Sequence, residues 1–241
     1  MRLYPAIDIK GSKCVRLTQG DFDRETVYYN TPLEAAKYWE SVGSKYIHIV
    51  DLDGSLEGRF INYDSLKAIA DNTNLKIQFG GGIRSLSDVE QLLSIGVDRI
   101  VIGSLAIKDF DKFSEIVKKY PQNIVCAVDF KDGSIMGDGW TTGGSISVDA
   151  FVKKATDAGC LAFLATDISR DGMLSGPAFE AYDRLKSITS AEIIASGGIS
   201  SLEDLSKLNA LGLPSAIVGK AFYEEKFTFQ SALEITRRSS C

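Results

Sequence analysis

Two stretches of the sequence decide the fold: GGIRSLSDVEQLLSIG at residues 81–96 and GGISSLEDLSKLNALG at residues 197–212. They resemble each other at an offset of 116 residues, and the same offset places Gly103 of IVIGS on Gly219 of AIVGK. A second resemblance joins AIDIKG near the start to AVDFKDG in the middle, with Asp8 matched to Asp129 at an offset of 121. Self-similarity at a long, nearly fixed offset indicates two similar halves in tandem.

Within each half, short apolar runs alternate with stretches of helical periodicity. Continuous apolar runs of this kind are typical of parallel strands that are buried on both faces. Eight alternations in 241 residues match the size of a (β/α)8 barrel. A doubly wound open sheet is the alternative, and it is disfavoured because it usually needs fewer strands and no run resembles an edge strand. The expected strands are Leu3–Ile9, Tyr46–Leu52, Lys76–Phe79, Arg99–Ile102, Ile124–Phe130, Leu161–Thr166, Glu192–Ala195 and Ala216–Val218. The expected helices are Leu33–Val42, Tyr63–Ala70, Ser87–Ile95, Phe110–Lys119, Val148–Ala158, Ala178–Ile188, Leu202–Leu211 and Phe229–Arg237.

Each half of such a barrel would expose half of the core if it stood alone. The two halves must therefore pair, and we predict that residues 1–241 form a single domain. The half-barrels are expected at about residues 1–120 and 121–241, and no low-complexity linker separates them.

The composition narrows the possible functions. The formal net charge is −5 and the pI is about 5.1, which argues against a nucleic-acid-binding protein with a strongly basic surface. The only histidine is His48, so a zinc site with two or three histidine ligands is excluded within one chain. We predict no metal site, and we expect any acid–base chemistry near neutral pH to use carboxylates.

Cysteine spacing and hydropathy bear on the compartment. Cys14, Cys126, Cys160 and Cys241 form no CxxC motif, so they are expected to be small buried or terminal residues. The N-terminus MRLYPAIDIKGSK has no hydrophobic signal region, and no run approaches the length of a membrane span. We therefore expect a cytoplasmic protein with no membrane partner. A monomer is the default expectation, since no heptad seam stands out.

Two aspartates stand near the ends of opposed strands. Asp8 lies in the first expected strand and Asp129 in the fifth. In a closed barrel of eight strands these two strands face each other, so both carboxylates point into one mouth, where barrel enzymes place their catalytic groups. Such a pair suits general acid–base catalysis. A lone aspartate at a strand end more often caps a loop, but a symmetric pair favours function.

Glycine-rich turns form a second symmetric feature. Glycine pairs follow the third and seventh strands, and a single glycine follows the fourth and eighth strands. Backbone N–H groups in such turns converge on an anion, and the strand seven and eight position is the common phosphate site of these barrels. Two such sites imply an elongated substrate with a phosphate at each end, although any one glycine pair alone is more often a tight turn. The predicted phosphate-binding residues are Gly81, Gly82, Gly103, Ser104, Gly197, Gly198, Gly219 and Lys220.

Further candidates lie close to these strand ends. Asp171 follows the sixth strand on a loop that Gly172 lets bend, although the Asp-Gly pair is also a common turn. Thr166 is a possible hydroxyl donor beside Asp129. Arg84, directly after the first glycine run, is placed either to bind phosphate or to be a solvated charge.

Two aromatic candidates each have a structural alternative to a role in the site. Trp140 lies in GDGWTTGG, where it either closes over a heterocycle or packs the loop down. His48 lies inside the second strand, and this position is more often that of a hydrogen-bonded core residue than of a catalyst.

Several motifs in order resemble one known family over essentially the whole chain. They resemble the ProFAR isomerase family, the aldose–ketose isomerases of histidine biosynthesis. The motifs are PAIDIKGSKCVRL, HIVDLDGS, QFGGGIRS, VIGS, AVDFKDG, GDGW, ATDISRDGMLSGP, ASGGISS and AIVGKAF.

The resemblance implies an Amadori rearrangement of a bisphosphorylated substrate, without a cofactor because each charge shift is a proton transfer. It implies that Asp8 is the general base that takes the C2′ proton and that Asp129 is the general acid at the ring oxygen. It also implies that Thr166 supports Asp129 and that Asp171 acts from a closing loop. Substrate contacts are implied for His48, Arg84 and Trp140, the last stacking on the imidazole carboxamide, and a phosphate contact for Gly176.

Three alternatives stay open. The related cyclase subunit of imidazole glycerol phosphate synthase shares both aspartates, but it reads CLDVK where this chain has AIDIK, and it lacks HIVDLDG and GDGW. Bifunctional isomerases that also accept phosphoribosylanthranilate carry an arginine before the tryptophan, where this chain has Asp138 and Gly139. A phosphosugar-binding scaffold barrel without activity is disfavoured because both aspartates are present.

Overall fold

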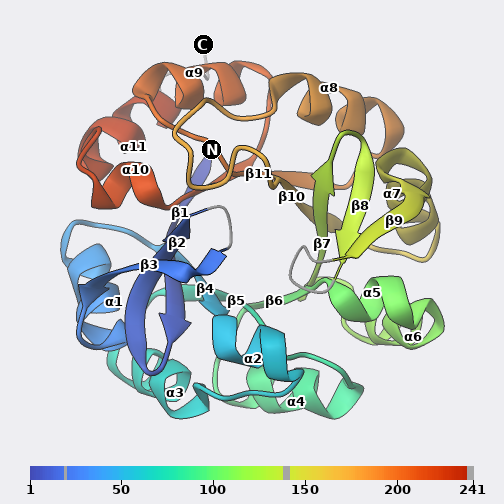
Figure 1. Ribbon diagram of the computed structural model, residues 1–241, viewed down its shortest axis with the longest axis horizontal. Helices are drawn as coiled ribbons and strands as arrows, with labels where there is room; N and C mark the ends of the chain where they lie inside the picture. Colours follow the sequence, from blue (N-terminus) through green and yellow to red (C-terminus); the bar gives the residue numbers. More distant parts are fainter. Residues whose placement is uncertain (19–20, 138–141, 238–241) are drawn as a thin grey trace.

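The computed structural model describes residues 1–18, 21–137 and 142–237. Eight parallel strands in it form a closed barrel in the order β10, β11, β12, β1, β4, β5, β6, β7, and β7 pairs back with β10 (Figure 1). The predicted (β/α)8 barrel is therefore confirmed. The barrel strands are β1 (Arg2–Lys10), β4 (Tyr46–Asp51), β5 (Lys76–Gly80), β6 (Arg99–Ile102), β7 (Ile124–Lys131), β10 (Ala162–Asp167), β11 (Glu192–Ser196) and β12 (Ser215–Val218).

Helices surround the barrel and cover the outward faces of its strands. All eight predicted helical stretches are present, and three short helices that the sequence pattern did not reveal, α2, α5 and α10, follow β4, β6 and β12. The helices are α1 (Pro32–Ser41), α2 (Leu52–Glu57), α3 (Tyr63–Asn72), α4 (Leu86–Ser94), α5 (Ser104–Lys108), α6 (Phe110–Lys119), α7 (Val148–Asp157), α8 (Phe179–Ile188), α9 (Leu202–Ala210), α10 (Lys220–Tyr223) and α11 (Phe229–Arg237).

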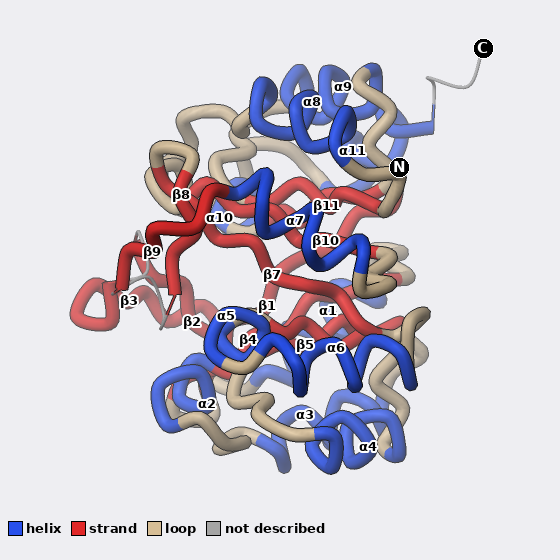
Figure 2. Tube along the Cα trace, turned by 90° about the vertical axis from the view of Figure 1, so that its right-hand side faces the viewer, coloured by secondary structure: helices blue, strands red, loops and turns tan. Residues whose placement is uncertain are grey.

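Two β-hairpins extend the barrel, one in each half, in segments where the sequence analysis expected neither a strand nor a helix. They are formed by β2 (Lys13–Thr18) with β3 (Asp21–Tyr29) and by β8 (Ser134–Gly137) with β9 (Thr142–Ser147). Figure 2 shows all four strands at one end of the barrel, with the N-terminus at the other end.

A two-residue turn connects β1 to β2, and a matching turn connects β7 to β8. Gly11 and Ser12 both have positive φ, at 54° and 60°, and so do Asp132 and Gly133, at 50° and 76°. Two consecutive left-handed residues are typical of tight hairpin turns. Both Gly-Ser and Asp-Gly are residue pairs that occur in such turns. The hairpins are therefore the part of the fold that the strand–helix alternation did not predict.

The helices after the glycine pairs begin with the same cap in both halves. The side chain of Ser85 accepts a hydrogen bond from the backbone N–H of Asp88, and Ser201 accepts one from Asp204 in the same way. In both cases the Asp side chain accepts a hydrogen bond from the backbone of the cap residue, which completes a capping box. The caps fix how the chain turns from strand to helix, and they hold the glycine turns in equivalent positions.

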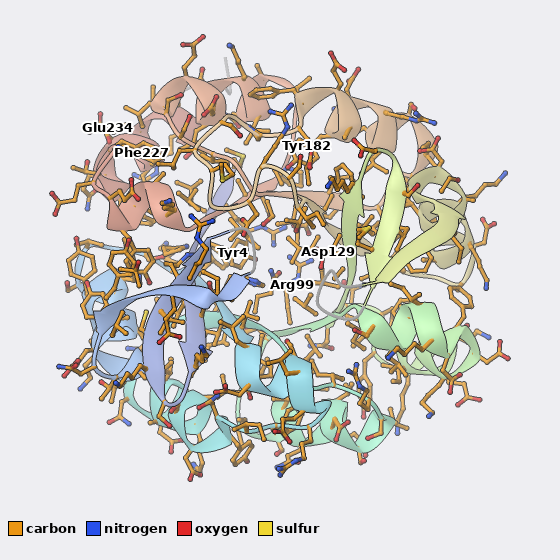
Figure 3. All side chains as sticks on the ribbon, in the orientation of Figure 1. Tyr4, Arg99, Asp129, Tyr182, Phe227 and Glu234 are labelled. Atoms are coloured by element: carbon orange, nitrogen blue, oxygen red, sulfur yellow. The ribbon has the colours of Figure 1, made fainter. Side chains whose placement is uncertain are left out.

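The interior of the barrel is apolar at mid-height and charged at the end away from the hairpins. Tyr4 and Arg99 lie inside the ring of strands (Figure 3). Glu192 forms ion pairs with Arg99 at 3.2 Å and with Arg2 at 2.7 Å, and it accepts a hydrogen bond from the Ser215 hydroxyl at 2.6 Å. These four polar side chains come from four different strands, so the network ties the barrel together at this end.

Candidate active site

A cavity of about 260 Å³ opens at the carboxyl ends of the barrel strands, the end that carries the hairpins. It brings together all but two of the predicted site residues. The predicted residues that line it are Asp8, His48, Gly81, Gly82, Arg84, Gly103, Ser104, Asp129, Thr166, Asp171, Gly197, Gly198, Gly219 and Lys220.

Two predicted site residues do not line this cavity. Trp140 lies outside the described residues, and so does the part of its loop that distinguishes the bifunctional isomerases. Gly176 supports the site instead: its N–H donates to the Gly198 carbonyl at 2.9 Å, and its own carbonyl packs so closely on Gly198 that a side chain there would collide with it. A phosphate contact of Gly176 stays a prediction.

Asp8 is held in the cavity by a buried ion pair. The carboxylate contacts a guanidinium nitrogen of Arg16 at 2.8 Å, with the two side chains 14% and 10% exposed. Burial raises the pKa of Asp8 to about 6, while the positive charge of Arg16 opposes this rise and the negative charge of Asp171 adds to it. A carboxyl group with a pKa near 6 exists in both protonation states close to neutral pH, which suits a general base.

Arg16 is a site residue that the sequence analysis missed. It lies on β2, and the hairpin register, which pairs Asp8 with Val15, brings the next residue back over the barrel mouth. Its guanidinium lies against the α-carbon of Gly219, where any side chain would collide with it. The Nε atom of Arg16 is buried and makes no hydrogen bond within the described part of the chain.

Asp129 lies across the cavity from β1, on β7. It is the register partner of Thr166 on β10, so the carboxylate and the hydroxyl stand on neighbouring strands at the same height. Asp171 comes from the turn that follows β10, where its N–H donates to the Asp167 carbonyl at 3.2 Å. Three carboxylates from β1, β7 and the loop after β10 therefore face one cavity.

His48 is buried in the barrel wall beneath Asp8. Its Nδ1 accepts a hydrogen bond from the side-chain amide of Gln78 at 3.1 Å. Burial, together with the nearby charge of Arg16, lowers the pKa of His48 to about 3. The imidazole is therefore neutral near pH 7 and adds no positive charge to the cavity.

The glycine turns of the two halves adopt the same conformation. Gly81 and Gly82 have φ of 113° and 76°, and Gly197 and Gly198 have φ of 86° and 77°. A side chain on Gly81 would collide with the Asp51 carbonyl. These turns therefore require glycine, both for the left-handed backbone and for the close approach of neighbouring chain segments.

Each half also contributes a cation to the cavity wall, and the two cations stand at exchanged positions of the repeat. In the first half it is Arg84, whose guanidinium packs against Gly58. In the second half it is Lys220, whose ammonium donates to the Gly172 carbonyl at 2.9 Å and lies 3.5 Å from Glu224. Both glycine turns and both cations line the same cavity, and Arg16 adds a third cation next to Gly219.

Within residues 1–18, 21–137 and 142–237, no group of three or more His, Cys, Asp or Glu side chains is arranged to hold a metal ion. No helix in the same residues is long and apolar enough to cross a membrane.

Comparisons with known proteins agree with one another. A family model described as "Histidine biosynthesis protein" matches residues 2–228. Relatives from three organisms carry the name 1-(5-phosphoribosyl)-5-((5-phosphoribosylamino)methylideneamino)imidazole-4-carboxamide isomerase. The relative from Clostridioides difficile (strain 630) is 43% identical over 98% of both chains. The one from Clostridium acetobutylicum is 44% identical over 99% of this chain and 100% of its own. The one from Thermoanaerobacter sp. (strain X514) is 43% identical over 98% of this chain and 100% of its own.

Proposed function

The chain belongs to the family of histidine biosynthesis proteins and is an isomerase like its named relatives, and we propose that it works by carboxylate acid–base catalysis at the barrel mouth. The observation that carries this mechanism is the placement of Asp8 and Asp129 on opposed strands of one cavity, with a glycine turn and a cation contributed by each half. The relatives' name contains two phosphoribosyl groups. A substrate of that kind would place one phosphate at each turn and its reacting sugar between the aspartates.

The proposed reaction is an Amadori rearrangement. Asp129 donates a proton to the ring oxygen, and the bond between that oxygen and C1′ breaks to leave an iminium group. Asp8 then takes the proton from C2′, and the released electron pair forms the C1′–C2′ double bond of an enolamine. In the last step C1′ receives a proton from Asp8, while the C2′ hydroxyl returns its proton to Asp129. The product is an aminoketose, and both carboxyl groups regain their starting states.

Neighbouring residues support these two groups. Arg16 keeps a share of Asp8 ionised against the cost of burial, so that a base is present near neutral pH. Thr166 stands where it would orient Asp129, and Asp171 where it would act during closure of the loop. Arg84 and Lys220 would add charge to the phosphate contacts, and Trp140 would stack on the imidazole carboxamide.

The direct test is turnover of the substrate by the purified protein. ProFAR is supplied and its conversion is followed spectroscopically, and conversion is expected. Failure of the well-folded protein to convert it would favour the scaffold alternative. Phosphoribosylanthranilate is the second substrate, and we propose that it is not converted. Its turnover would identify a bifunctional isomerase instead.

The pKa of Asp8 predicts the acid side of the pH profile. The base form is lost as the pH falls through about 6, so kcat/KM should fall about tenfold per pH unit below that value. The measurement is kcat/KM between pH 4.5 and 8.5, with circular dichroism to show that the fold persists and viscosity variation to show that chemistry limits the rate. A flat profile from pH 5 to 7 under these conditions would contradict the assignment of Asp8 as base.

Substitution of Gly81 tests the first phosphate contact. Gly81→Ala is expected to raise KM about tenfold, equivalent to about 1.4 kcal/mol of binding, because the new Cβ collides with the Asp51 carbonyl and displaces the turn. Gly96→Ala is the matched control: Gly96 has a similar φ of 90°, but nothing lies within 4 Å of its Cβ position. Equal KM values in the two variants would show that the Gly81 turn does not contact substrate.

Other expectations from the sequence stay predictions. We propose a single domain, since the strands of the two halves join one closed sheet, where β1 pairs with β12 and β6 with β7, and no linker separates the halves. A monomeric state and a cytoplasmic location are also proposed, and gel filtration and cell fractionation would test them.

A further inference from the structure

We propose that Asn62 is a positioning residue for the proposed reaction: it anchors the Gly11–Ser12 turn, which joins β1 to β2, to the first glycine turn and thereby holds Arg16 on Asp8. This inference rests on the proposed function, because it concerns how the proposed base is kept in its working environment. Asn62 directly precedes α3 and is 5% exposed.

The side chain of Asn62 does not cap the helix that follows it. Asparagine is among the preferred residues before a helix because its side chain can cap the first turn. Here it makes no such cap. Its amide nitrogen donates instead to Asp51 at 2.7 Å and to Asp53 at 2.8 Å, and its Oδ1 accepts from the backbone N–H of Ser12 at 3.0 Å. The helix cap is given up for contacts with other segments.

On one side Asn62 is joined to the glycine turn through Asp51. Asp51 is fully buried, and its carboxylate also accepts hydrogen bonds from the backbone N–H groups of Gly54 at 2.8 Å and Ile61 at 3.0 Å. The Asp51 carbonyl packs on the α-carbon of Gly81. A saturated, buried carboxylate of this kind is a rigid point, because displacing it would leave it without hydrogen bonds.

On the other side Asn62 holds the turn between β1 and β2. Ser12 and Gly11 form the two-residue turn. The Gly11 N–H donates to Asp53 at 2.7 Å, and Asp53 is itself hydrogen-bonded to Asn62, so both turn residues are tied to this pair of side chains. The turn sets the register that pairs Asp8 with Val15. Arg16 follows Val15 and reaches Asp8 at 2.8 Å. A shift of the turn would therefore be transmitted to Arg16 along four residues of chain.

The second half of the barrel has no equivalent of Asn62. At the matching position of the repeat stands Ala178, which precedes α8 with no side-chain cap. Asp167, the counterpart of Asp51, binds Ser169 and Arg170 of its own loop instead. The second half folds without this anchor, so the architecture does not require it. The anchor is confined to the half that carries Arg16.

The electrostatic consequence follows from the groups around Asp8. Arg16 is the cation in contact with it, and loss of that contact removes the influence that lowers its pKa. Burial and the negative charge of Asp171 would remain, so the pKa of Asp8 would rise. The other ionisable groups nearby are Cys14 on β2, neutral His48 on β4, Asp129 on β7 and Lys220 after β12.

The test compares Asn62→Ala with Asn72→Ala, an equivalent change at the end of the same helix, where the exposed amide bonds only the Ala68 carbonyl. Asn62→Ala is expected to lower kcat/KM about tenfold and to move the acid limb of the pH profile to higher pH. Asn72→Ala should change neither. In an Arg16→Gln background, Asn62→Ala should have little further effect, since Asn62 acts through Arg16.

An unshifted acid limb in Asn62→Ala, or effects of the Asn62 and Arg16 substitutions that simply multiply, would overturn the proposal. If Asn62→Ala fails to fold, Asp53→Ala removes only the Gly11 contact and one Asn62 contact, and a smaller shift in the same direction is expected. An unshifted acid limb in Asp53→Ala would also overturn the proposal. A wild-type protein without isomerase activity would instead overturn the proposed function, so the two failures are distinguishable.

Discussion

Replacing Asp8 with Asn is expected to lower kcat by about a thousandfold, because the amide cannot accept the C2′ proton. The change is nearly isosteric. Arg16 loses the negative charge of its partner, but the packing around Arg16 is preserved. Asp129→Asn is expected to cost a similar factor, because the ring oxygen then leaves without protonation. KM should change little in both variants, since neither carboxylate is proposed to contact a phosphate.

The measurements are kcat and KM with ProFAR, together with the affinity for the product in each variant. Asp111→Asn on α6 is the control, because it removes a negative charge from an exposed residue that does not line the cavity. Turnover within tenfold of wild type in both cavity variants would reject acid–base catalysis by this pair. A drop in only one would show that its partner acts by binding alone.

Removal of Glu192 is expected to have the largest effect on stability. Glu192→Ala leaves Arg99 and Arg2 without their shared carboxylate, with the Arg99 side chain only 14% exposed. Breaking a buried ion pair by deleting one partner typically costs 3–5 kcal/mol, and the partial exposure of this network places the expected loss of unfolding free energy at about 3 kcal/mol. Since the network lies at the far end from the cavity, kcat should be unchanged at temperatures where the variant is folded.

Urea unfolding measures this loss, and Glu90→Gln supplies the comparison. Glu90 forms an exposed pair with Lys119 at 2.7 Å, and such surface pairs contribute about 0–1 kcal/mol. Equal stability losses in the two variants would show that the Glu192 network contributes no more than an exposed pair.

The contribution of Glu192 should also depend on pH. Burial raises its pKa, but the hydrogen bond from Ser215 and the charge of Arg99 outweigh burial, so the pKa is lower than in the unfolded chain. A group with a lowered pKa stabilises the fold above its unfolded pKa, about 4.3 for Glu, and loses this effect as the pH falls through the lower folded value. The stability difference between wild type and Glu192→Ala should therefore be full above about pH 5 and shrink below about pH 4. A difference that is constant down to pH 3 would contradict this.

The barrel was predictable because its evidence is local and repeated. Each strand is a short apolar run, each main helix has its own period, and the 116-residue offset shows the same glycine turn twice. Asp8 and Asp129 were predictable for a related reason, since strand ends in a closed barrel share one mouth. The hairpins were not predicted, because glycine-rich segments such as 142–147 lack the alternation that marks a strand.

Arg16 and Asn62 were missed because their contacts cannot be inferred from the local pattern of apolar and polar residues. Arg16 meets Asp8 only because the Gly11–Ser12 turn folds the chain back against β1. Asn62 bonds to Ser12 across 50 residues of sequence, and its position before a helix suggests a cap that it does not make. Side chains that act through distant partners require the tertiary structure to be recognised.

The charged network at the far end of the barrel also makes the two halves differ in the charge that each contributes. Arg2 and Arg99 belong to the first half, and Glu192 and Ser215 belong to the second. Two copies of the first half would bring four arginines together with no carboxylate from the network, and two copies of the second would bring carboxylates with no arginine. The repeat gives the two halves the same architecture. The network favours pairing of a first half with a second half over pairing of two identical halves.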